Sequence, residues 1–206
     1  LSSLSAPSIE APSNGFAATS LATAFSDSAF DLKNQIGSQA VIDGDDGFVA
    51  LNTAFLYDGA YVNVPDGHSG QVVVRVSYIT VDGTTPIVTH PRTLIVAGRN
   101  TDVTVVESYN GPQDMAYFTN AVTEISVGEA AHVDHYRLLL EGDKAFHVGT
   151  SRVNQAKDSK FDSASFALGA ELARNDMEVM FDATGGYCSL NGLYLTADRQ
   201  HIDNLI

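Results

Sequence analysis

The sequence predicts an all-β protein built as a parallel β-helix, a solenoid in which successive coils of the chain stack on one another. Three observations favour this class. Short runs rich in Val and Ile alternate between apolar and polar residues, as half-buried strands do. Tight turns follow the runs near residues 66, 99, 129, 159 and 185, a period of roughly thirty residues. A strand–turn–strand unit at constant spacing favours stacked coils over a sandwich or an up-and-down barrel, which short strands can also build.

The clearest unit spans residues 92–107. A β-branched run, Leu94 to Val96, meets a polar turn that contains Gly98 and Asn100, and a second run follows from Val103 to Val106. Val and Ile suit a pleated surface because their χ1 angles are restricted. Gly and Asn supply the positive φ that tight turns need. This stretch therefore predicts two strands joined at one corner of a coil.

The same unit recurs along the chain. The first strand is expected at Ala60–Val64, and Pro65-Asp-Gly is the turn that ends it. The stretch 111–115 interrupts one coil, and we expect it to be an exposed loop. The other units join Val62–Gly67 to Val72–Val76, Glu124–Ala131 to Val133 and Tyr136–Leu140, Asp158–Lys160 to Phe161–Leu168, and Gly185–Gly186 to Cys188–Leu195.

The chain divides into an N-terminal segment, residues 1–47, and a β-helix core, residues 48–206. The N-terminal segment is rich in Ser, Ala and Pro, and we expect it to be partly disordered. Helical spacing from Leu21 to Phe30, with Thr19 or Ser20 as the cap, predicts one short helix. A further helical turn over Leu51–Leu56 is expected to dock on the end of the solenoid.

Composition limits the function. The 206 residues carry a net charge of −14, which argues against binding to nucleic acid, because that binding requires a basic surface. No apolar run approaches the roughly twenty residues that span a bilayer, and no signal peptide is recognisable. The chain starts without Met and stops while the coil pattern still runs, so we expect it to be a segment of a longer protein.

Two possible sites are weighed from the residues alone. His132-Val-Asp-His135, with Glu129 nearby, suggests a metal site, but positions 132 and 135 of a strand point to opposite faces. The two rings are therefore not expected to share an ion, and no metal ligand is assigned. Cys188 is the single cysteine, with no basic residue near it in sequence to lower its pKa, so a structural thiol is expected.

No catalytic residue is assigned either. The sequence has no Gly-x-Ser-x-Gly elbow, phosphate loop, Rossmann glycine series or HExxH helix. A single cysteine also favours a reducing compartment. We therefore expect a cytoplasmic protein, or one of the plastid stroma if the source is a photosynthetic eukaryote.

An ordered series of motifs runs along residues 48–206: Ala50–Phe55, Asp58-Gly59, Val62–Gly67, His90–Ile95, Val105–Ser108, Asn120–Ile125, Arg174-Asn175, Asn191–Tyr194 and Gln200–Asp203. This series resembles the SufB/SufD family of iron–sulfur cluster assembly scaffolds. The Asn191-Gly-Leu-Tyr194 form, with the shortage of cysteine, resembles the SufD branch more than SufB.

This resemblance implies a right-handed parallel β-helix and a non-catalytic scaffold subunit. Such a subunit pairs with a SufB-like subunit, recruits a SufC-like ATPase through a C-terminal helical region, and assists iron supply to the nascent cluster. That helical region, and the histidine of the SufD branch thought to act at the SufB interface, would lie beyond Ile206. No cofactor is expected in this segment, and iron or a cluster would be held only transiently in the full complex.

The partner surface is expected at the C-terminal end of the β-helix. Unpaired strand edges recruit other strands, so Leu190–Ile206 should lie at or beside an interface with a SufB-like subunit or a second copy of the chain. The alternative function is a β-helix carbohydrate-active enzyme of the polyuronate lyase or hydrolase type, because fold does not determine function. Such an enzyme needs clustered carboxylates, whereas six acidic residues here read as turn residues: Asp43, Asp45, Asp46, Asp58, Asp66 and Asp82.

Overall fold

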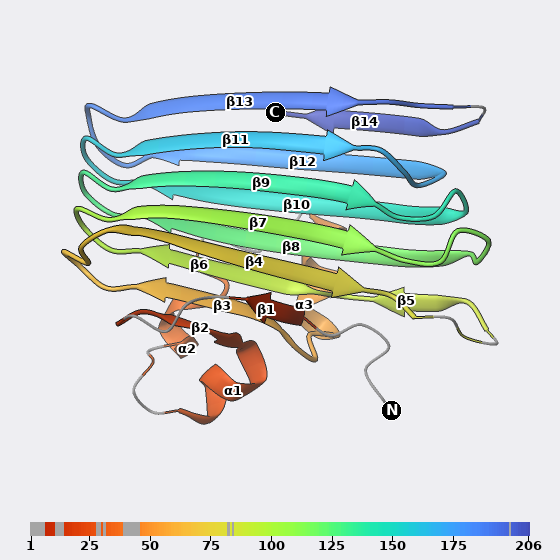
Figure 1. The fold of residues 1–206 in the computed structure, drawn as a ribbon, viewed down its shortest axis with the longest axis horizontal. Coiled ribbons are helices and arrows are strands. Elements are labelled where there is room, and N and C mark those ends of the chain that lie inside the picture. The colour runs from red at the N-terminus through yellow and green to blue at the C-terminus, as the bar shows by residue number, and fades with distance from the viewer. Residues whose placement is uncertain are drawn as a thin grey trace.

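The computed structural model describes residues 7–10, 15–27, 30, 32–38, 46–81, 83, 85–197 and 199–206. Within them the chain forms a parallel β-solenoid of two sheets stacked face to face (Figure 1). Each coil places one strand in each sheet, so residues about one coil apart in the sequence become neighbours. The predicted β-helix is confirmed.

The first sheet has six strands and the second has eight. All pairs are parallel except β1 with β4 and β2 with β3, at the N-terminal end. The six-stranded sheet runs in the order β1 (Pro7–Glu10), β4 (Gln71–Ile79), β7 (Asp102–Asn110), β9 (His132–Leu140), β11 (Lys160–Ala167) and β13 (Tyr187–Tyr194). The eight-stranded sheet contains β14 (His201–Leu205), β12 (Leu172–Phe181), β10 (Ala145–Gln155), β8 (Tyr117–Val127), β6 (Arg92–Ala97), β3 (Gly59–Val64) and β2 (Ala17–Ser20), with β5 (Ile87–Thr89) beside β8.

One corner of every coil contains a residue with positive φ. Asn100, in the turn predicted to need it, has φ 55°, and its N–H donates to the carbonyl of Glu129 in the next coil at 3.0 Å. Ala130 adopts φ 53° at the equivalent place in the next coil. Residues with a Cβ disfavour this conformation, so the sequence around Ala130 does not predict it. The backbone bonds between coils stabilise this corner. Its residues are Gly67, Asn100, Ala130, Asp158 and Gly185.

Among the described residues, three helices flank the eight-stranded sheet. α1 (Leu21–Ser26) begins where predicted, with the Ser20 hydroxyl accepting from the Thr23 N–H at 3.1 Å, but it ends before the predicted Phe30. Residues 28 and 29 of that prediction lie outside the described part of the chain. α1 and α2 (Leu32–Gln35) pack through Leu21, Ala24 and Leu32 on Tyr61 and Leu94, which face out of the sheet.

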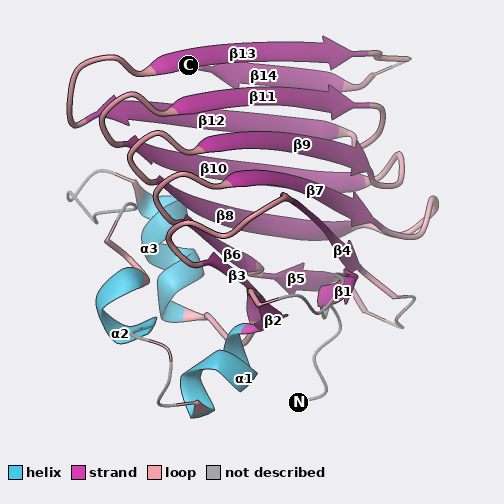
Figure 2. Ribbon diagram, turned by 60° about the vertical axis from the view of Figure 1, so that its left-hand side comes forward, coloured by secondary structure: helices cyan, strands magenta, loops and turns pink. Residues whose placement is uncertain are grey.

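α3 (Gly47–Ala54) corrects one prediction. It lies against the outer face of the eight-stranded sheet at β8 and β10 (Figure 2), whereas the sequence predicts a helical turn over Leu51–Leu56 docked on the end of the solenoid. Val49 of the helix packs on Val122, and the buried Asn52 anchors it. Strands β1 and β2, rather than this helix, pair with the first coil. No helix of the described residues is long and apolar enough to cross a membrane.

The loop at 111–115 is only partly the exposed loop that was predicted. Gln113 and Asp114 are exposed, but Met115 packs against the core. Gly111 lies so close to Tyr117 that a Cβ would fall 2.2 Å from its hydroxyl oxygen. The loop therefore closes one side of the coil instead of projecting freely.

Candidate functional site

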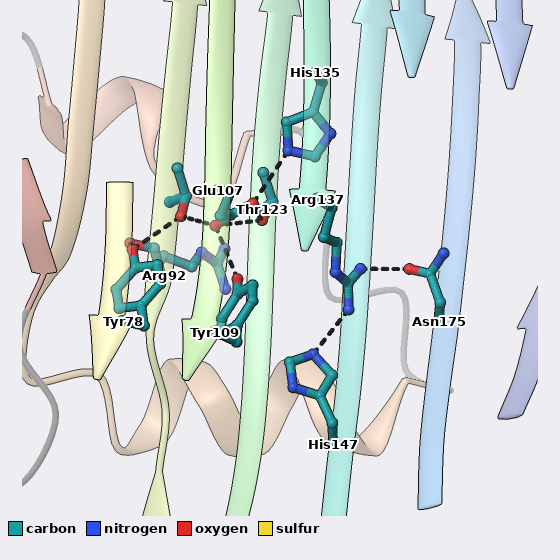
Figure 3. Close-up of polar contacts among 10 residues, drawn as sticks. Tyr78, Arg92, Glu107, Tyr109, Thr123, His135, Arg137, His147 and Asn175 are labelled. Atoms are coloured by element: carbon teal, nitrogen blue, oxygen red, sulfur yellow. Dashed lines mark hydrogen bonds and ion pairs between the residues drawn. The ribbon is translucent and has the colours of Figure 1, made fainter. Parts of the chain in front are cut away.

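Buried polar side chains interrupt the apolar core between the two sheets. They come from both sheets and meet near the middle of the solenoid (Figure 3). Ionisable groups are rarely buried without partners, so this concentration is the main chemical feature of the interior. We call it the interior polar network: Tyr78, Thr93, Glu107, Tyr109, Thr119, Thr123, His135, Arg137, Glu141, His147 and Asn175.

Glu107 is the centre of one half of this network. Its carboxylate accepts hydrogen bonds from the hydroxyls of Thr93, Tyr109 (2.8 Å) and Thr123 (3.1 Å), and from Nε2 of His135 (3.1 Å). Burial alone would raise the pKa of Glu107. The hydrogen bond and charge of His135, the Thr93 hydroxyl and the charge of Arg137 outweigh burial and lower the pKa to about 2. The carboxylate is therefore ionised although no solvent reaches it.

Arg137 is the centre of the other half. Its guanidinium donates to Asn175 Oδ1 and, at 2.8 Å, to Nε2 of His147. Since arginine can only donate, Nε2 of His147 must accept, so its Nδ1 carries the proton and donates to Glu141 at 2.6 Å. The pKa of His147 is lowered from its ordinary value, and burial is the largest cause. A neutral imidazole of defined tautomer thus links a buried cation to a buried anion.

Aromatic rings join the two halves. Tyr78 and Tyr109 stack with ring centroids 5.2 Å apart, and Tyr109 meets His147 edge to face at 4.8 Å. The guanidinium carbon of Arg137 lies 5.8 Å from the Tyr109 ring. Burial, reinforced by the charge of Glu107, raises the pKa values of both tyrosines well above the ordinary value, so the phenols remain donors.

A second buried polar group lies on the outer face of the eight-stranded sheet, under α3. Arg92, 1% exposed, donates from Nε to Glu124 at 2.9 Å and from Nη1 to Asn52 at 3.1 Å. Asn52 also donates to the carbonyls of Pro91 and Asn120, each at 2.9 Å. The motifs His90–Ile95 and Asn120–Ile125 therefore supply the bonds that fix α3 on the sheet.

His132 and His135 point to opposite faces of β9, as predicted. His135 enters the interior polar network, and His132 faces solvent on the six-stranded sheet. Glu129 pairs with Lys157 instead of His132. His132 nevertheless has carboxylate neighbours that the sequence analysis missed: Asp134 on its own strand and Asp162 on the next coil, both 3.2 Å from Nε2. The structure sets a 28-residue register offset between β9 and β11, and this offset places position 134 opposite 162.

Cys188 is partly buried and packs against the core from β13. Burial, with the charge of Asp162, raises the pKa of its thiol, which agrees with the expectation that nothing nearby lowers it. The turn aspartates behave as predicted where they are described. Asp46 caps α3, Asp58 accepts from the Ala22 N–H, and Asp66 accepts from Arg99. Asp43, Asp45 and Asp82 lie outside the described residues.

The interior polar network was also missed by the sequence analysis, which assigned no site residue. One signal was present: Gly149 stands in the middle of a strand, where glycine weakens pairing and marks a close approach by another group. The alternation of β7 and β9 also places Glu107, His135 and Arg137 on the inward face. Their partners come from strands up to 38 residues away, which the residue pattern of one strand does not show.

Fold and interior together define a parallel β-solenoid with an ionised core. Residues 79–206 match the family described as "SUF system FeS cluster assembly, SufBD core domain". An iron–sulfur cluster assembly SufBD family protein of Synechocystis sp. is 33% identical over 84% of this chain and 39% of its own length. This chain belongs to the SufBD family of iron–sulfur cluster assembly proteins.

Two other relatives are more distant. The iron–sulfur cluster assembly protein SufD of Escherichia coli is 23% identical over 76% of this chain and 37% of its own length. The chloroplastic protein ABCI7 of Arabidopsis thaliana is 23% identical over 56% of this chain and 25% of its own length. The chain therefore spans about two fifths or less of the curated relatives it matches.

Proposed function

We propose that this chain is the β-helix part of a non-catalytic scaffold subunit in an iron–sulfur cluster assembly complex of the SufBCD type. In that complex it pairs with a SufB-like subunit, associates with a SufC-like ATPase through a region outside this chain, and assists iron supply to the nascent cluster. The match of residues 79–206 to the SufBD core domain carries the proposal. Similarity to the SufD protein of Escherichia coli favours the SufD branch.

The coil at the C-terminal end of the solenoid supports a pairing surface there. β13 pairs with β11 and β14 pairs with β12, and neither has a second neighbour among the described strands. Another strand can add to such an edge, either from a following coil of the full-length protein or from a partner subunit. Large apolar side chains surround these edges: Leu193 is 50% exposed, Leu195 is 63% exposed and Leu205 is 50% exposed.

Co-expression of the full-length protein with its SufB-like partner tests the proposal. A stable heterodimer in analytical ultracentrifugation is expected, and the pair Leu193→Lys with Leu195→Lys should weaken it by at least tenfold. Val81→Lys is the matched control, because Val81 is 49% exposed and lies in the loop after β4, away from β13 and β14. A SufC-like ATPase should co-purify with the heterodimer.

Three results would contradict parts of this proposal. A full-length protein that remains monomeric alone and with the SufB-like subunit would overturn the scaffold function. A homodimer that excludes the SufB-like subunit would overturn the choice of partner. A heterodimer that the Leu193 and Leu195 substitutions leave unchanged would place the interface elsewhere on the protein.

A further inference from the structure

We propose that His132, Asp134 and Asp162, on the solvent-facing side of the six-stranded sheet, form a binding site for a divalent transition-metal ion such as Zn²⁺. The site lies outside the interior polar network and does not use the β13 and β14 edges. The inference goes beyond the proposed function and does not depend on it.

The stacking of coils assembles these ligands. His132 and Asp134 lie two positions apart on β9, so they share its outer face. In the register of the sheet, Asp162 of β11 lies opposite Asp134, and Lys160 lies opposite His132. On the other side, Asp102 of β7 lies opposite His132. Strand backbone therefore fixes the relative positions of all the groups, which is what a metal site requires of its scaffold.

The distances agree with metal coordination. Nε2 of His132 lies 3.2 Å from Oδ1 of Asp134 and 3.2 Å from Oδ2 of Asp162. Zinc bonds of about 2.0–2.1 Å at angles between octahedral and tetrahedral place neighbouring ligand atoms about 2.9–3.4 Å apart. The three ligand atoms all lie within 4.8 Å of one another.

The cluster has more acceptors than donors. The Nε2–H of His132 can point at only one carboxylate, and it bonds to Asp162. Asp134 lies equally near Nε2 but accepts no hydrogen bond in the described part of the chain, although its side chain is only 22% exposed. Asp102 adds a third carboxylate 3.9 Å from Nδ1. This excess of negative charge favours a cation with more than one coordination position.

Lys160 supplies part of that positive charge in the absence of metal. Its Nζ lies 2.7 Å from Oδ2 of Asp162, the same oxygen that bonds to His132. A metal ion must displace the ammonium group, and the ring of Tyr187, 5.5 Å from Nζ, provides a second contact for it. Lys160 and a metal ion therefore compete for the carboxylate of Asp162. Non-specific binding of metal to surface carboxylates would not show this competition, so the competition provides a test.

The ligand set selects the class of metal. Imidazole nitrogen with carboxylate oxygen suits zinc, iron, cobalt and manganese, whereas Ca²⁺ and Mg²⁺ prefer oxygen alone. Three protein ligands leave at least one coordination position for water. Zn²⁺ and Co²⁺ are the probes of choice, because Zn²⁺ binds such sites tightly and Co²⁺ reports its geometry by absorption.

The experiment uses the full chain with Cys188→Ser, treated with chelator, so that the single thiol contributes no binding. Zn²⁺ is titrated against a chromophoric chelator, and Co²⁺ is followed by visible absorption. We expect one ion per chain. His132→Gln and Asp162→Asn should each weaken binding at least tenfold, and Lys160→Gln should strengthen it several-fold, because the Asp162 carboxylate is released.

The controls are His201→Gln and Asp182→Asn, an exposed histidine and an exposed aspartate away from the cluster, and both should bind as the parent does. Thermal unfolding of each metal-free variant shows whether it folds. Binding that is unchanged within twofold in His132→Gln and Asp162→Asn, or weakened equally by the two controls, would overturn the proposal. Weaker binding in Lys160→Gln would also contradict it, since the lysine would then be aiding the ion.

Discussion

The guanidinium group of Arg137 fills the space beside the backbone of Gly149 on the facing sheet. A Cβ atom at position 149 would lie 1.7 Å from Nη2 of Arg137. The same nitrogen bonds to His147, two residues earlier on β10. The guanidinium group of Arg137 therefore leaves no room for a side chain at position 149 of the facing strand. Any other residue at position 149 would displace the arginine.

Gly149→Ala should lower the free energy of unfolding by about 3–5 kcal/mol, because displacing Arg137 leaves buried charges without their partners. The measurement is urea unfolding followed by circular dichroism. Gly47→Ala is the control. Nothing lies within 4 Å of a Cβ at that helical position, so the change there should be neutral or stabilising by up to about 1 kcal/mol. Equal destabilisation by the two substitutions would contradict the role of Arg137.

Glu107→Gln should remove a pH-dependent part of the stability. The folded pKa of Glu107 is lowered from 4.5 to about 2. The stability it contributes is therefore fully present above pH 4.5 and is lost as the pH falls toward 2. The difference in unfolding free energy between wild type and variant should shrink by about 3 kcal/mol across this interval. The control is Glu129→Gln at a half-exposed turn, where the substitution removes no buried hydrogen bond. A difference that is constant with pH in Glu107→Gln would contradict the assignment.

His147 should carry its proton on Nδ1 and remain neutral in mildly acidic solution. Its Nε2 accepts from Arg137, and burial lowers its folded pKa below 6.5. The unfolded chain then protonates first as the pH falls, so this residue decreases stability below about pH 6.5. Long-range proton–nitrogen spectra give the tautomer and the titration directly. A resonance pattern with the proton on Nε2 would show that the bond to Arg137 is not formed as described.

Asn52→Ala should release α3 from the sheet. The substitution removes one hydrogen bond each from the carbonyls of Pro91 and Asn120 and from Nη1 of Arg92, at a cost of about 2–4 kcal/mol. Hydrogen exchange of amides 47–54 should accelerate more than exchange in β10. Asn191→Ala is the control, because Asn191 is exposed and its side chain bonds only to Ser189 among the described contacts. Protection of the helix that matches wild type would contradict this anchoring role.

Anaerobic reconstitution of this chain with iron and sulfide should yield no stable, stoichiometric cluster. Most iron–sulfur clusters are held by several thiolates, and the chain has one cysteine. Iron and sulfide analysis after desalting is the measurement, with Cys188→Ser as the control that should behave identically. A stoichiometric cluster that Cys188→Ser abolishes would contradict the expectation of a structural thiol.

The sequence alone was sufficient for the fold class, because each coil repeats a local signal. Valine-rich runs and turn residues such as Asn100 are properties of a few neighbouring positions, and their period predicts stacking without knowledge of the partner strand. The motif series from His90 to Asp203 was likewise readable, and it indicated the family that residues 79–206 match. Where the local signal was weak, as at Ala130 and in the docking of α3, prediction was incomplete or wrong.

The candidate sites were decided by tertiary structure. Glu107 and His135 are 28 residues apart, and Arg137 and Asn175 are 38 apart, so their contacts depend on the register of strands and the facing of two sheets. The same holds for His132 and Asp162, 30 residues apart, whereas the sequence pair His132 and His135 separates to opposite faces. Alternation along one strand determines which side chains point inward. Only the offset between coils, set by the length of each corner, determines which of them meet.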